Sequence, residues 1–470
     1  MKHVFAAGLS LFIAACHAFA QKEAPLPKDL PPYGPQPAFH APDVKESKLA
    51  NGLTVWLVSQ PGLPKVSFRI AVLSGLASDP ADRPGMAELL AKTLSQGTKT
   101  RSAKQIAEEI QSAGGDLGVG SDRDSFSVST SVLSSKVDLA AELLADAVEN
   151  ASFPESEVTL AKRNLISSLH EREAQPRFQA NRALARALFG SGPYSVVAPT
   201  EESINETSAE DLRREFARRF RPDQSLLVAV GDFETRRMST LIEQKFGSWK
   251  APAEQPAVVD AKPSTAAPHS AIIVPRPNSV QTTLVLAAFG PLRRDPDYEA
   301  TDLANAIYGG MFSSRLVTNI REDKGYTYSP GSGVATLRQA GVLRTQADVR
   351  NAVTGASVNE IMYELNRMAT TSPTDEEMSR AKRSLLGIEA IFLQSRGAVA
   401  DELSDQWVKG LGPDAIASYT QKITSTTVAD VDAAAKKYFP ASRMNIVAVG
   451  EDKVVRDALS PFGLPIETAK

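Results

Sequence analysis

The feature that most constrains the fold is an internal repeat of about 220 residues. Residues 161–165 read Ala-Lys-Arg-Asn-Leu, and residues 381–385 read Ala-Lys-Arg-Ser-Leu. A second pair of segments, 217–232 and 435–451, has nearly the same spacing. Each carries a basic pair, an aromatic residue, a proline, and then Val-Ala-Val-Gly followed by an acid. Because two independent matches share one spacing, the chain is predicted to contain two copies of one domain.

Each copy is expected to combine strands with helices. The Asn51-Gly52 pair separates two strand-like runs and is typical of a hairpin, because both residues tolerate positive φ. Thr207 or Ser208 is expected to cap a helix. Further strands are predicted at 66–73, 125–132 and 226–230, and helices at 102–113, 136–150, 155–173 and 209–220. The predicted fold class is α+β, with two homologous domains that each pack helices on a mainly antiparallel sheet.

Proline-rich stretches suggest the domain limits. The stretch 251–270 holds Pro252, Pro256, Pro263 and Pro268 with little hydrophobic periodicity, which indicates a linker. The two domains are therefore expected at 45–250 and 271–470. A second proline-rich stretch at 21–44 is expected to be an extended tether.

The N-terminus resembles an export signal. Met1-Lys2-His3 precedes an apolar run too short to span a bilayer, so residues 1–20 are expected to be a signal peptide. The small residues Ala18 and Ala20 favour plain cleavage, which leaves a periplasmic or secreted protein. Residues 13–16 also resemble a lipoprotein box, and lipid on Cys16 would tether the chain to a membrane. Membrane attachment is expected only in that second case.

The charge balance excludes an electrostatic footprint for nucleic acid. Lys and Arg number 52 against 55 Asp and Glu, which gives a net charge of -3. Metal ligands are also scarce. The only cysteine is Cys16, and beyond the first twenty residues the histidines are His40, His170 and His269, in no ligand spacing. His170 is expected to be a surface residue. The chain by itself is predicted to bind no zinc.

One helix has the frame of a zinc-peptidase motif without its ligands. Residues 85–98 read Gly-Met-Ala-Glu-Leu-Leu-Ala-Lys-Thr-Leu-Ser-Gln-Gly-Thr. The segment resembles the one in which the pitrilysin/insulinase (inverted zincin) family places His-x-x-Glu-His, but here those positions hold Glu88, Ala91 and Lys92. The family's third ligand, a glutamate, corresponds to Ser168. Alanine supplies no base and a protonated lysine is a poor ligand, so the resemblance implies a degenerate site.

A second segment keeps the family's pattern. Residues 309–316 read Gly-Gly-Met-Phe-Ser-Ser-Arg-Leu, and residues 319–329 read Asn-Ile-Arg-Glu-Asp-Lys-Gly-Tyr-Thr-Tyr-Ser. This resembles the signature whose arginine and tyrosine, seven residues apart, reach into the zinc site. Arg321 and Tyr328 have that spacing, and Tyr326 is a possible substitute. A short helix capped by Ser313 or Ser314 and a strand from Tyr326 are expected. The alternative is that Arg321 only complements a helix end and Tyr328 only packs on a sheet.

The resemblance implies work in pairs of chains. Some family members of this size lack the metal ligands, keep the Arg and Tyr, and pair with a homologous subunit that bears zinc. The resemblance thus implies a heterodimeric peptidase for short or unfolded peptides, in which Arg321 and Tyr328 act in the partner's site and this chain holds no cofactor. The rival interpretations are a scaffold or peptide-binding protein of the same fold and, less consistent with the histidine count, an active peptidase with another metal site.

Two further points stay open at this stage. Glu88 and Lys92 are four residues apart, so they are expected either to pair across the vacated zinc position or to be two solvated helix charges. The glycine-rich stretch 114–120 corresponds to the family's peptide-binding edge strand. It would either permit close backbone approach of a peptide or form an irregular loop.

Overall fold

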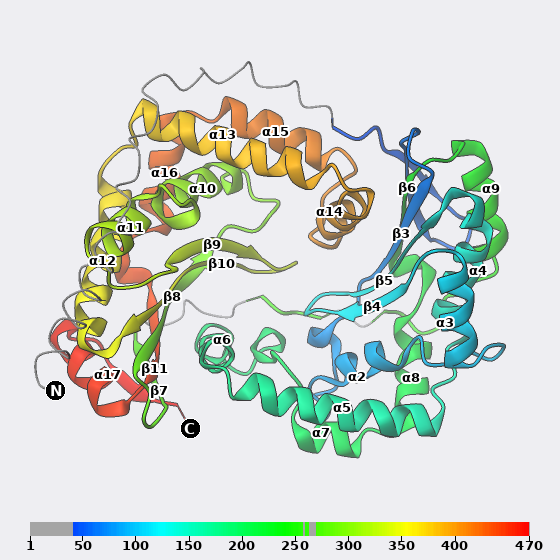
Figure 1. The fold of residues 1–470 in the computed structure, drawn as a ribbon, viewed down its shortest axis with the longest axis horizontal. Helices are drawn as coiled ribbons and strands as arrows, with labels where there is room; N and C mark the ends of the chain where they lie inside the picture. The colour runs from blue at the N-terminus through cyan, green and yellow to red at the C-terminus, as the bar shows by residue number, and fades with distance from the viewer. Residues whose placement is uncertain (1–40, 257–258, 263–268, 470) are drawn as a thin grey trace, which may run out of the picture. The chain divides into compact units, whose positions relative to one another are not determined.

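The computed structural model describes residues 41–256, 259–262 and 269–469 (Figure 1). The expected signal peptide, Cys16 and most of the expected tether lie outside these residues. None of the described helices is both long and apolar enough to cross a bilayer.

The first half forms a six-stranded sheet in the order β1-β2-β6-β3-β5-β4. Its neighbouring strands are antiparallel except β2 and β6, which run parallel. The strands are β1 (Lys45–Lys48), β2 (Thr54–Ser59), β3 (Lys65–Val72), β4 (Leu117–Ser121), β5 (Phe126–Leu133) and β6 (Ser225–Gly231).

The second half forms a similar six-stranded sheet in the order β12-β7-β11-β8-β10-β9. Its outer strand β12 follows the other strands in the chain and runs parallel to β7, whereas β1 precedes β2 and runs antiparallel to it. Strand β11 runs parallel to β7, as β6 does to β2, and β11 carries the second Val-Ala-Val-Gly run. The strands are β7 (Ala271–Pro275), β8 (Gln281–Gly290), β9 (Gly331–Thr336), β10 (Gly341–Arg350), β11 (Asn445–Gly450) and β12 (Ile466–Thr468). The predicted fold class is confirmed, whereas the exact domain limits stay a prediction.

Helices pack on both sheets. In the first half they are α2 (Met86–Thr93), α3 (Ala103–Ser112), α4 (Val137–Asn150), α5 (Glu155–Glu173), α6 (Pro176–Phe189), α7 (Glu201–Glu206), α8 (Ala209–Arg219) and α9 (Thr235–Phe246). In the second half they are α10 (Tyr298–Asn305), α11 (Arg315–Val317), α12 (Thr354–Thr370), α13 (Asp375–Phe392), α14 (Arg396–Val408), α15 (Ala415–Ser425), α16 (Val428–Tyr438) and α17 (Asp452–Leu459).

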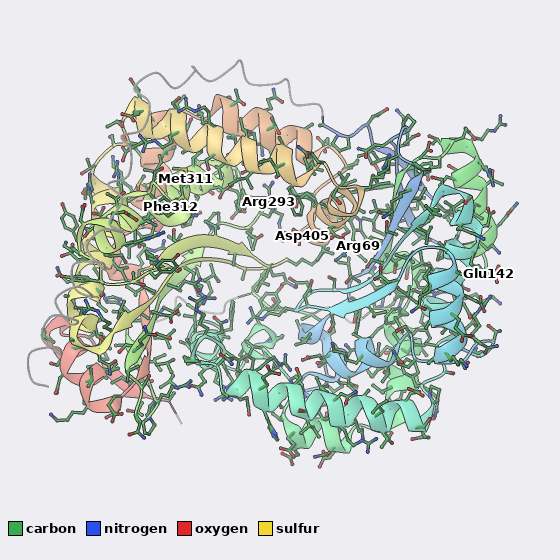
Figure 2. The ribbon with its side chains drawn as sticks, viewed as in Figure 1. Arg69, Glu142, Arg293, Met311, Phe312 and Asp405 are labelled. Atoms are coloured by element: carbon green, nitrogen blue, oxygen red, sulfur yellow. The ribbon has the colours of Figure 1, made fainter. Side chains whose placement is uncertain are left out.

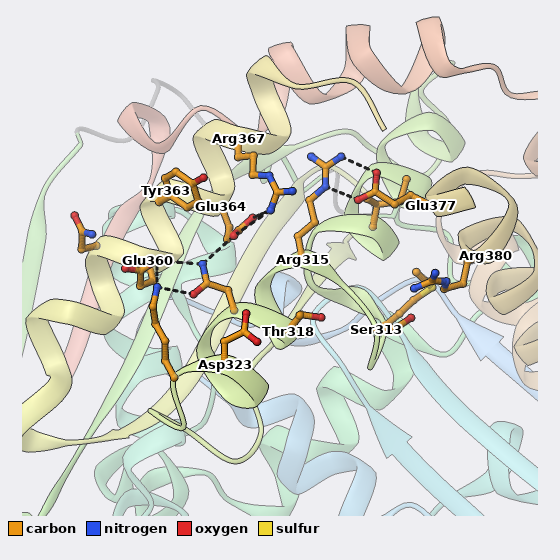
Figure 3. A pocket seen from close by; sticks show the side chains of 15 residues that line it. Ser313, Arg315, Thr318, Asp323, Glu360, Tyr363, Glu364, Arg367, Glu377 and Arg380 are labelled. Atoms are coloured by element: carbon orange, nitrogen blue, oxygen red, sulfur yellow. Dashed lines mark hydrogen bonds and ion pairs between the residues drawn. The ribbon is translucent and has the colours of Figure 1, made fainter. Parts of the chain in front are cut away.

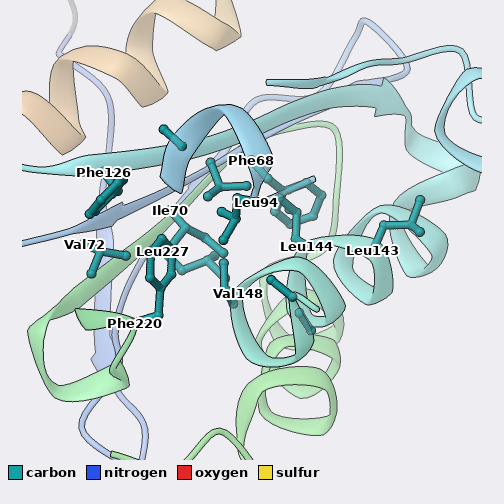
Figure 4. Packing of buried hydrophobic residues seen from close by; sticks show 14 of the residues in the cluster. Phe68, Ile70, Val72, Leu94, Phe126, Leu143, Leu144, Val148, Phe220 and Leu227 are labelled. Carbon is teal, nitrogen blue, oxygen red and sulfur yellow. The ribbon is translucent and has the colours of Figure 1, made fainter. Parts of the chain in front are cut away.

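A hydrophobic core lies between each sheet and its helices. In the first half Phe68 and Ile70 of β3 pack with Leu144 and Val148 of α4, and all four are buried (Figure 4). Full burial of such side chains contributes about 1.5–3 kcal/mol each. The second half has its own cluster around β8, β10 and β11.

Each half also lends a helix to the other half's sheet. Helix α14 packs on β3 and β6 (Figure 1), and Arg69, labelled in Figure 2, forms an ion pair of 2.5 Å with Asp401 of this helix. Helix α6 packs in turn on β8 and β11, where Leu184 and Leu188 contact Val285 and Val447. The two helices occupy equivalent places in the repeat. Helix α14 covers the second face of β6, so this strand is buried along its whole length. The central residues of its sequence are accordingly all apolar.

The local predictions are largely confirmed. Helix α5 has the predicted limits, and Ser208 rather than Thr207 caps α8, by accepting a hydrogen bond from the Asp211 N–H. The hairpin exists, but only Gly52 has positive φ. The Asn51 side chain instead accepts a hydrogen bond from the Leu53 N–H within the turn and donates one to the Phe246 carbonyl, which ties the turn to a distant helix.

Candidate functional site

Helix α2 holds the degenerate zinc-peptidase motif and begins abruptly. Its N-cap, Gly85, has φ 79°, and a Cβ at this position would meet Pro199 Cα at 2.2 Å, so only glycine fits. Within the helix Glu88 is half-buried, Ala91 is buried and Lys92 is exposed. Ser168 is an exposed residue of α5, the helix that packs beside α2.

Glu88 forms its ion pair with Arg172 of α5. Its Oε1 lies 3.1 Å from Arg172 Nη2, and the Glu88 side chain is only 19% exposed. No ion pair joins Glu88 to Lys92 within the described part of the chain, so the idea that Glu88 neutralises Lys92 is wrong. The acid is half-buried, and Arg172 is the cation placed to reach it.

The residues at the vacated position do not fit zinc. No group of three or more His, Cys, Asp or Glu side chains with metal-site geometry exists among the described residues. Glu88 already binds a guanidinium, and Ala91 offers no carboxylate to deprotonate a water molecule. His170 is exposed and lies 3.1 Å from Glu201, as a surface histidine does. No catalytic step through a metal bound to this chain can be derived from these residues.

Arg321 is held between two aromatic rings. Its Cζ lies 4.4 Å from the centroid of the Phe312 ring and 4.9 Å from that of the Tyr328 ring. Phe312 is 66% exposed and Tyr328 is 81% exposed. Tyr326 makes no such contact with Arg321 in the described structure. The predicted pair therefore lies together at the surface with Phe312, which is labelled in Figure 2.

Short helical turns hold this arginine in place. Ser314 caps α11 by accepting a hydrogen bond from the Val317 N–H, as predicted, and a wider turn over Thr318–Asp323 carries Arg321. Gly325 then turns the chain with φ 60°. The expected strand at Tyr326 is wrong, because β9 begins at Gly331. Thr327 instead donates to the Asp348 carbonyl, which fixes the turn against β10.

Ion pairs line a polar cavity of about 590 Å³ behind these turns (Figure 3). Arg315 Nε donates to Glu377 at 2.7 Å, and this contact holds the pKa of the Glu377 carboxyl at about 2. Lys324 pairs with Glu360 at 2.7 Å. Cations and carboxylates alternate here, so the pairs fix the turns that carry Arg321 and leave little net charge for a ligand.

A second cavity, of about 610 Å³, opens beside the vacated zinc position. Its walls come from α2, β4, α5 and α6 and from β9 and β10 of the second half, and they include Glu88, Ala91 and Lys92. Neither Arg321 nor Tyr328 is among the residues that line it. In this chain the two surviving motif residues and the degenerate helix are therefore not brought to one site.

Two family models match this chain. Residues 54–197 match the model described as Insulinase (Peptidase family M16), and residues 207–385 match the model described as Peptidase M16 inactive domain. The chain belongs to the pitrilysin/insulinase family. It is a member in which the metal-ligand positions are replaced.

Its relatives and structural neighbours agree with this family assignment. The chain is 24% identical over 400 residues to an uncharacterized zinc protease of Streptomyces coelicolor, covering 84% of this chain and 86% of the relative. It is 26% identical over 407 residues to one of Mycobacterium leprae, covering 85% and 90%.

Solved structures of the family have the same two-domain fold. A peptidase M16 inactive domain from Pseudomonas fluorescens superimposes with a TM-score of 0.81 at 26% identity, covering 87% of this chain and 98% of that chain. A protease from Helicobacter pylori gives 0.82 at 18% identity, covering 87% and 100%, and supports the fold alone.

Sequence reasoning missed three residues of these sites. Arg172 lies four residues after Ser168 on one helix, so helical spacing could have placed it near the vacated position. Phe312 stands inside the quoted motif but has no sequence feature that predicts its stacking on Arg321. Arg344 reaches the second cavity only because a strand of the second half borders it.

Proposed function

We propose that this chain is the metal-free subunit of a two-chain zinc metallopeptidase that cleaves short or unfolded peptides. The zinc and the His-x-x-Glu-His helix belong to a homologous partner, and this chain supplies Arg321 and Tyr328 to the partner's site. The proposal includes export to the periplasm or beyond the cell, directed by residues 1–20.

The observation that carries the proposal is the stacked cluster of Phe312, Arg321 and Tyr328. The Arg321 guanidinium lies against two rings, and its Nε is 3.1 Å from Glu322 Oε1, which together fix its direction. Its Nη N–H groups can meet a developing negative charge. A phenol beside it adds a second donor. Donors fixed before the reaction are what the oxyanion of a peptide-hydrolysis intermediate requires.

The position of the cluster supports a role in another chain. Arg321 and Tyr328 do not line the cavity beside the degenerate helix of their own chain. Tyr328 is largely exposed to solvent. Tyrosine side chains are usually more buried than this in a folded protein. A partner's site would give both side chains a substrate to contact.

A second candidate is a scaffold or peptide-binding protein of the same fold. Strand β4, from the glycine-rich stretch, lies at the edge of the first sheet and borders the second cavity, so it offers free backbone groups to an extended peptide. Peptide binding at β4 does not require Arg321, so the two candidates separate in experiment.

The test is zinc-dependent hydrolysis of an unstructured peptide by this chain, by a homologous chain with intact His-x-x-Glu-His, and by their mixture. Activity of the mixture alone, lowered at least tenfold by Arg321→Ala, is the expected result. Arg350→Ala, an exposed arginine at the end of β10, is the matched control and should leave the rate unchanged. Full activity of the partner alone, unaffected by this chain, would overturn the proposal in favour of the second candidate.

A further inference from the structure

The cavity beside the vacated zinc position carries an excess of positive charge. Four cationic side chains line it, Lys92, Arg123, Arg172 and Arg344, against two carboxylates, Glu88 and Asp122. Its volume of about 610 Å³ is in the range of cavities that hold small ligands. The positive charge available to a ligand depends on which groups the two carboxylates already bind.

Both carboxylates are engaged elsewhere. Glu88 pairs with Arg172. Asp122 Oδ1 accepts hydrogen bonds of 2.7 Å from the N–H groups of Asp124 and Ser125, which fixes the carboxylate to its own turn. Neither forms an ion pair with Arg123 or Arg344 in the described structure, and Asp122 offsets the charge of Arg123 only in part.

Arg123 lies two residues after β4, near the carboxylates of Asp122 and Asp124. Its guanidinium makes no hydrogen bond and no ion pair within 4.0 Å with a described residue. The neighbouring Asp124 accepts hydrogen bonds from the Tyr194 hydroxyl and the Arg338 N–H, so its charge offsets that of Arg123 only in part and without a direct contact. Burial lowers the pKa of Arg123, which reflects the cost of its charge in this position.

Arg344 approaches the same cavity from β10 of the second half. Its Nη2 donates to Gln346 Oε1 at 2.8 Å, and no carboxylate pairs with it among the described residues. Its Nε is buried without a hydrogen-bond partner there. Burial lowers the pKa of Arg344, and the nearby Arg177 adds to the effect. Two half-buried guanidinium groups thus reach one cavity, and neither forms an ion pair with a carboxylate of the described residues.

An anion would offset this cost. Guanidinium groups bind carboxylates through paired hydrogen bonds, and these strengthen where water is excluded. The rest of the wall is mostly apolar, with Phe178, Leu188, Leu337 and Val342 beside the polar Ser121 and Asn181. A ligand that joins a carboxylate to an apolar group matches both parts of the wall.

The bordering strands indicate which kind of carboxylate. Val119, Gly120 and Ser121 of β4 and Ala335 of β9 line the cavity, and β4 and β9 are edge strands of their sheets. Edge strands offer unpaired backbone N–H and C=O groups that an extended peptide can meet. Arg123 comes two residues after the end of β4. One end of a peptide paired with β4 would therefore lie near Arg123.

We propose that this cavity binds the carboxyl-terminal end of a peptide, with the terminal carboxylate held by Arg123 and Arg344 and the last, apolar side chain against α6. The vacated zinc site has in this way become part of a carboxylate-binding site. The proposal concerns this chain alone and requires no zinc and no partner, so its failure would leave the proposed composite peptidase untouched.

The experiment is calorimetric titration of the purified chain with an N-acetylated apolar tripeptide, as the free acid and as the carboxyl-terminal amide. The free acid should bind at least tenfold more tightly than the amide. Arg123→Gln and Arg344→Gln should each weaken binding of the acid at least tenfold, whereas the control Arg350→Gln on β10 should not change it. Equal binding of acid and amide by the unaltered chain would overturn the proposal even if a variant failed to fold.

A titration with a fatty acid distinguishes the two kinds of ligand that join a carboxylate to an apolar group, a peptide and a lipid. Dodecanoate has no backbone groups for β4, so it should bind more weakly than the tripeptide acid. Arginine-dependent binding of dodecanoate without binding of the tripeptide would overturn the assignment to a peptide.

Discussion

The Glu88 carboxylate lies 3.1 Å from the Arg172 guanidinium, and Glu88 is one of the positions that the family resemblance assigns to a metal ligand. The positive charge that Glu88 contacts therefore comes from a side chain of the neighbouring helix and not from a metal ion. The substitution keeps α2 and α5 joined through opposite charges, although no metal connects them. It also leaves Lys92 exposed beside the pair.

The first prediction concerns the stability of this pair. Glu88→Gln leaves the half-buried Arg172 without its counter-charge and should lower the free energy of unfolding by about 1–3 kcal/mol. Lys92→Ala, four residues further on, should change it by less than about 0.5 kcal/mol, because Lys92 is exposed. Urea denaturation of both variants measures the difference. Equal losses would contradict the assignment of Arg172 as the partner.

The second prediction concerns zinc. Restoring the family's ligands with Glu88→His, Ala91→Glu, Lys92→His and Ser168→Glu should give a site that binds zinc weakly, because Arg172 would then be an unpaired cation beside the metal. Adding Arg172→Gln should tighten binding at least tenfold.

Competition with a chromophoric chelator measures this affinity. The matched control is Arg163→Gln, which removes an exposed arginine from the same helix and should have no effect. Tight zinc binding by the variant that keeps Arg172 would show that the guanidinium does not oppose the metal.

The third prediction concerns the stack around Arg321 and rests on the proposed function. Phe312→Ala removes one of the two rings that hold the guanidinium and should lower the kcat of the mixed subunits about two- to fivefold, as expected for an exposed cation–π contact. The KM should change little, because Phe312 is assigned to orient Arg321 rather than to contact substrate. Phe312→Tyr keeps the ring and should restore the rate. A purely structural role would give a stability loss with no kcat effect.

The fourth prediction concerns pH. Burial, aided by the Glu402 carboxylate, raises the pKa of Glu389 to about 7 from an ordinary 4.5. Between these values the folded chain retains a proton that the unfolded chain has released, so this carboxyl lowers stability as the pH rises from about 4.5 to about 7. Glu389→Gln removes the effect.

The stability of Glu389→Gln relative to the unaltered chain should therefore rise by about 1 kcal/mol between about pH 5 and pH 8, a value reduced for partial solvent screening. Urea denaturation at both pH values measures it. A relative stability that stays constant across this range would show that the carboxyl is ionised in the folded chain at pH 5.

Parts of the candidate site were predictable from local sequence. The ligand losses at Glu88, Ala91, Lys92 and Ser168 follow from residue types in one helical frame and one later helix. The start of α11 at Ser314 follows from capping chemistry. The pairing of Glu88 was not predictable in this way, because i,i+4 spacing favours Lys92 and only the packing of α5 beside α2 brings Arg172 closer.

The sequence by itself determined the duplication, the α+β class and most helix limits. The helix limits depend on periodicity, caps and turns within a few residues of one another. The duplication is visible because similar segments recur about 220 residues apart. Only the tertiary structure decided that α6 and α14 cross to the other half's sheet, and that Arg123 and Arg344 meet in one cavity. Such contacts join residues from about 100 to more than 300 positions apart in the chain, and their free energy depends on burial and charge, which no local pattern records.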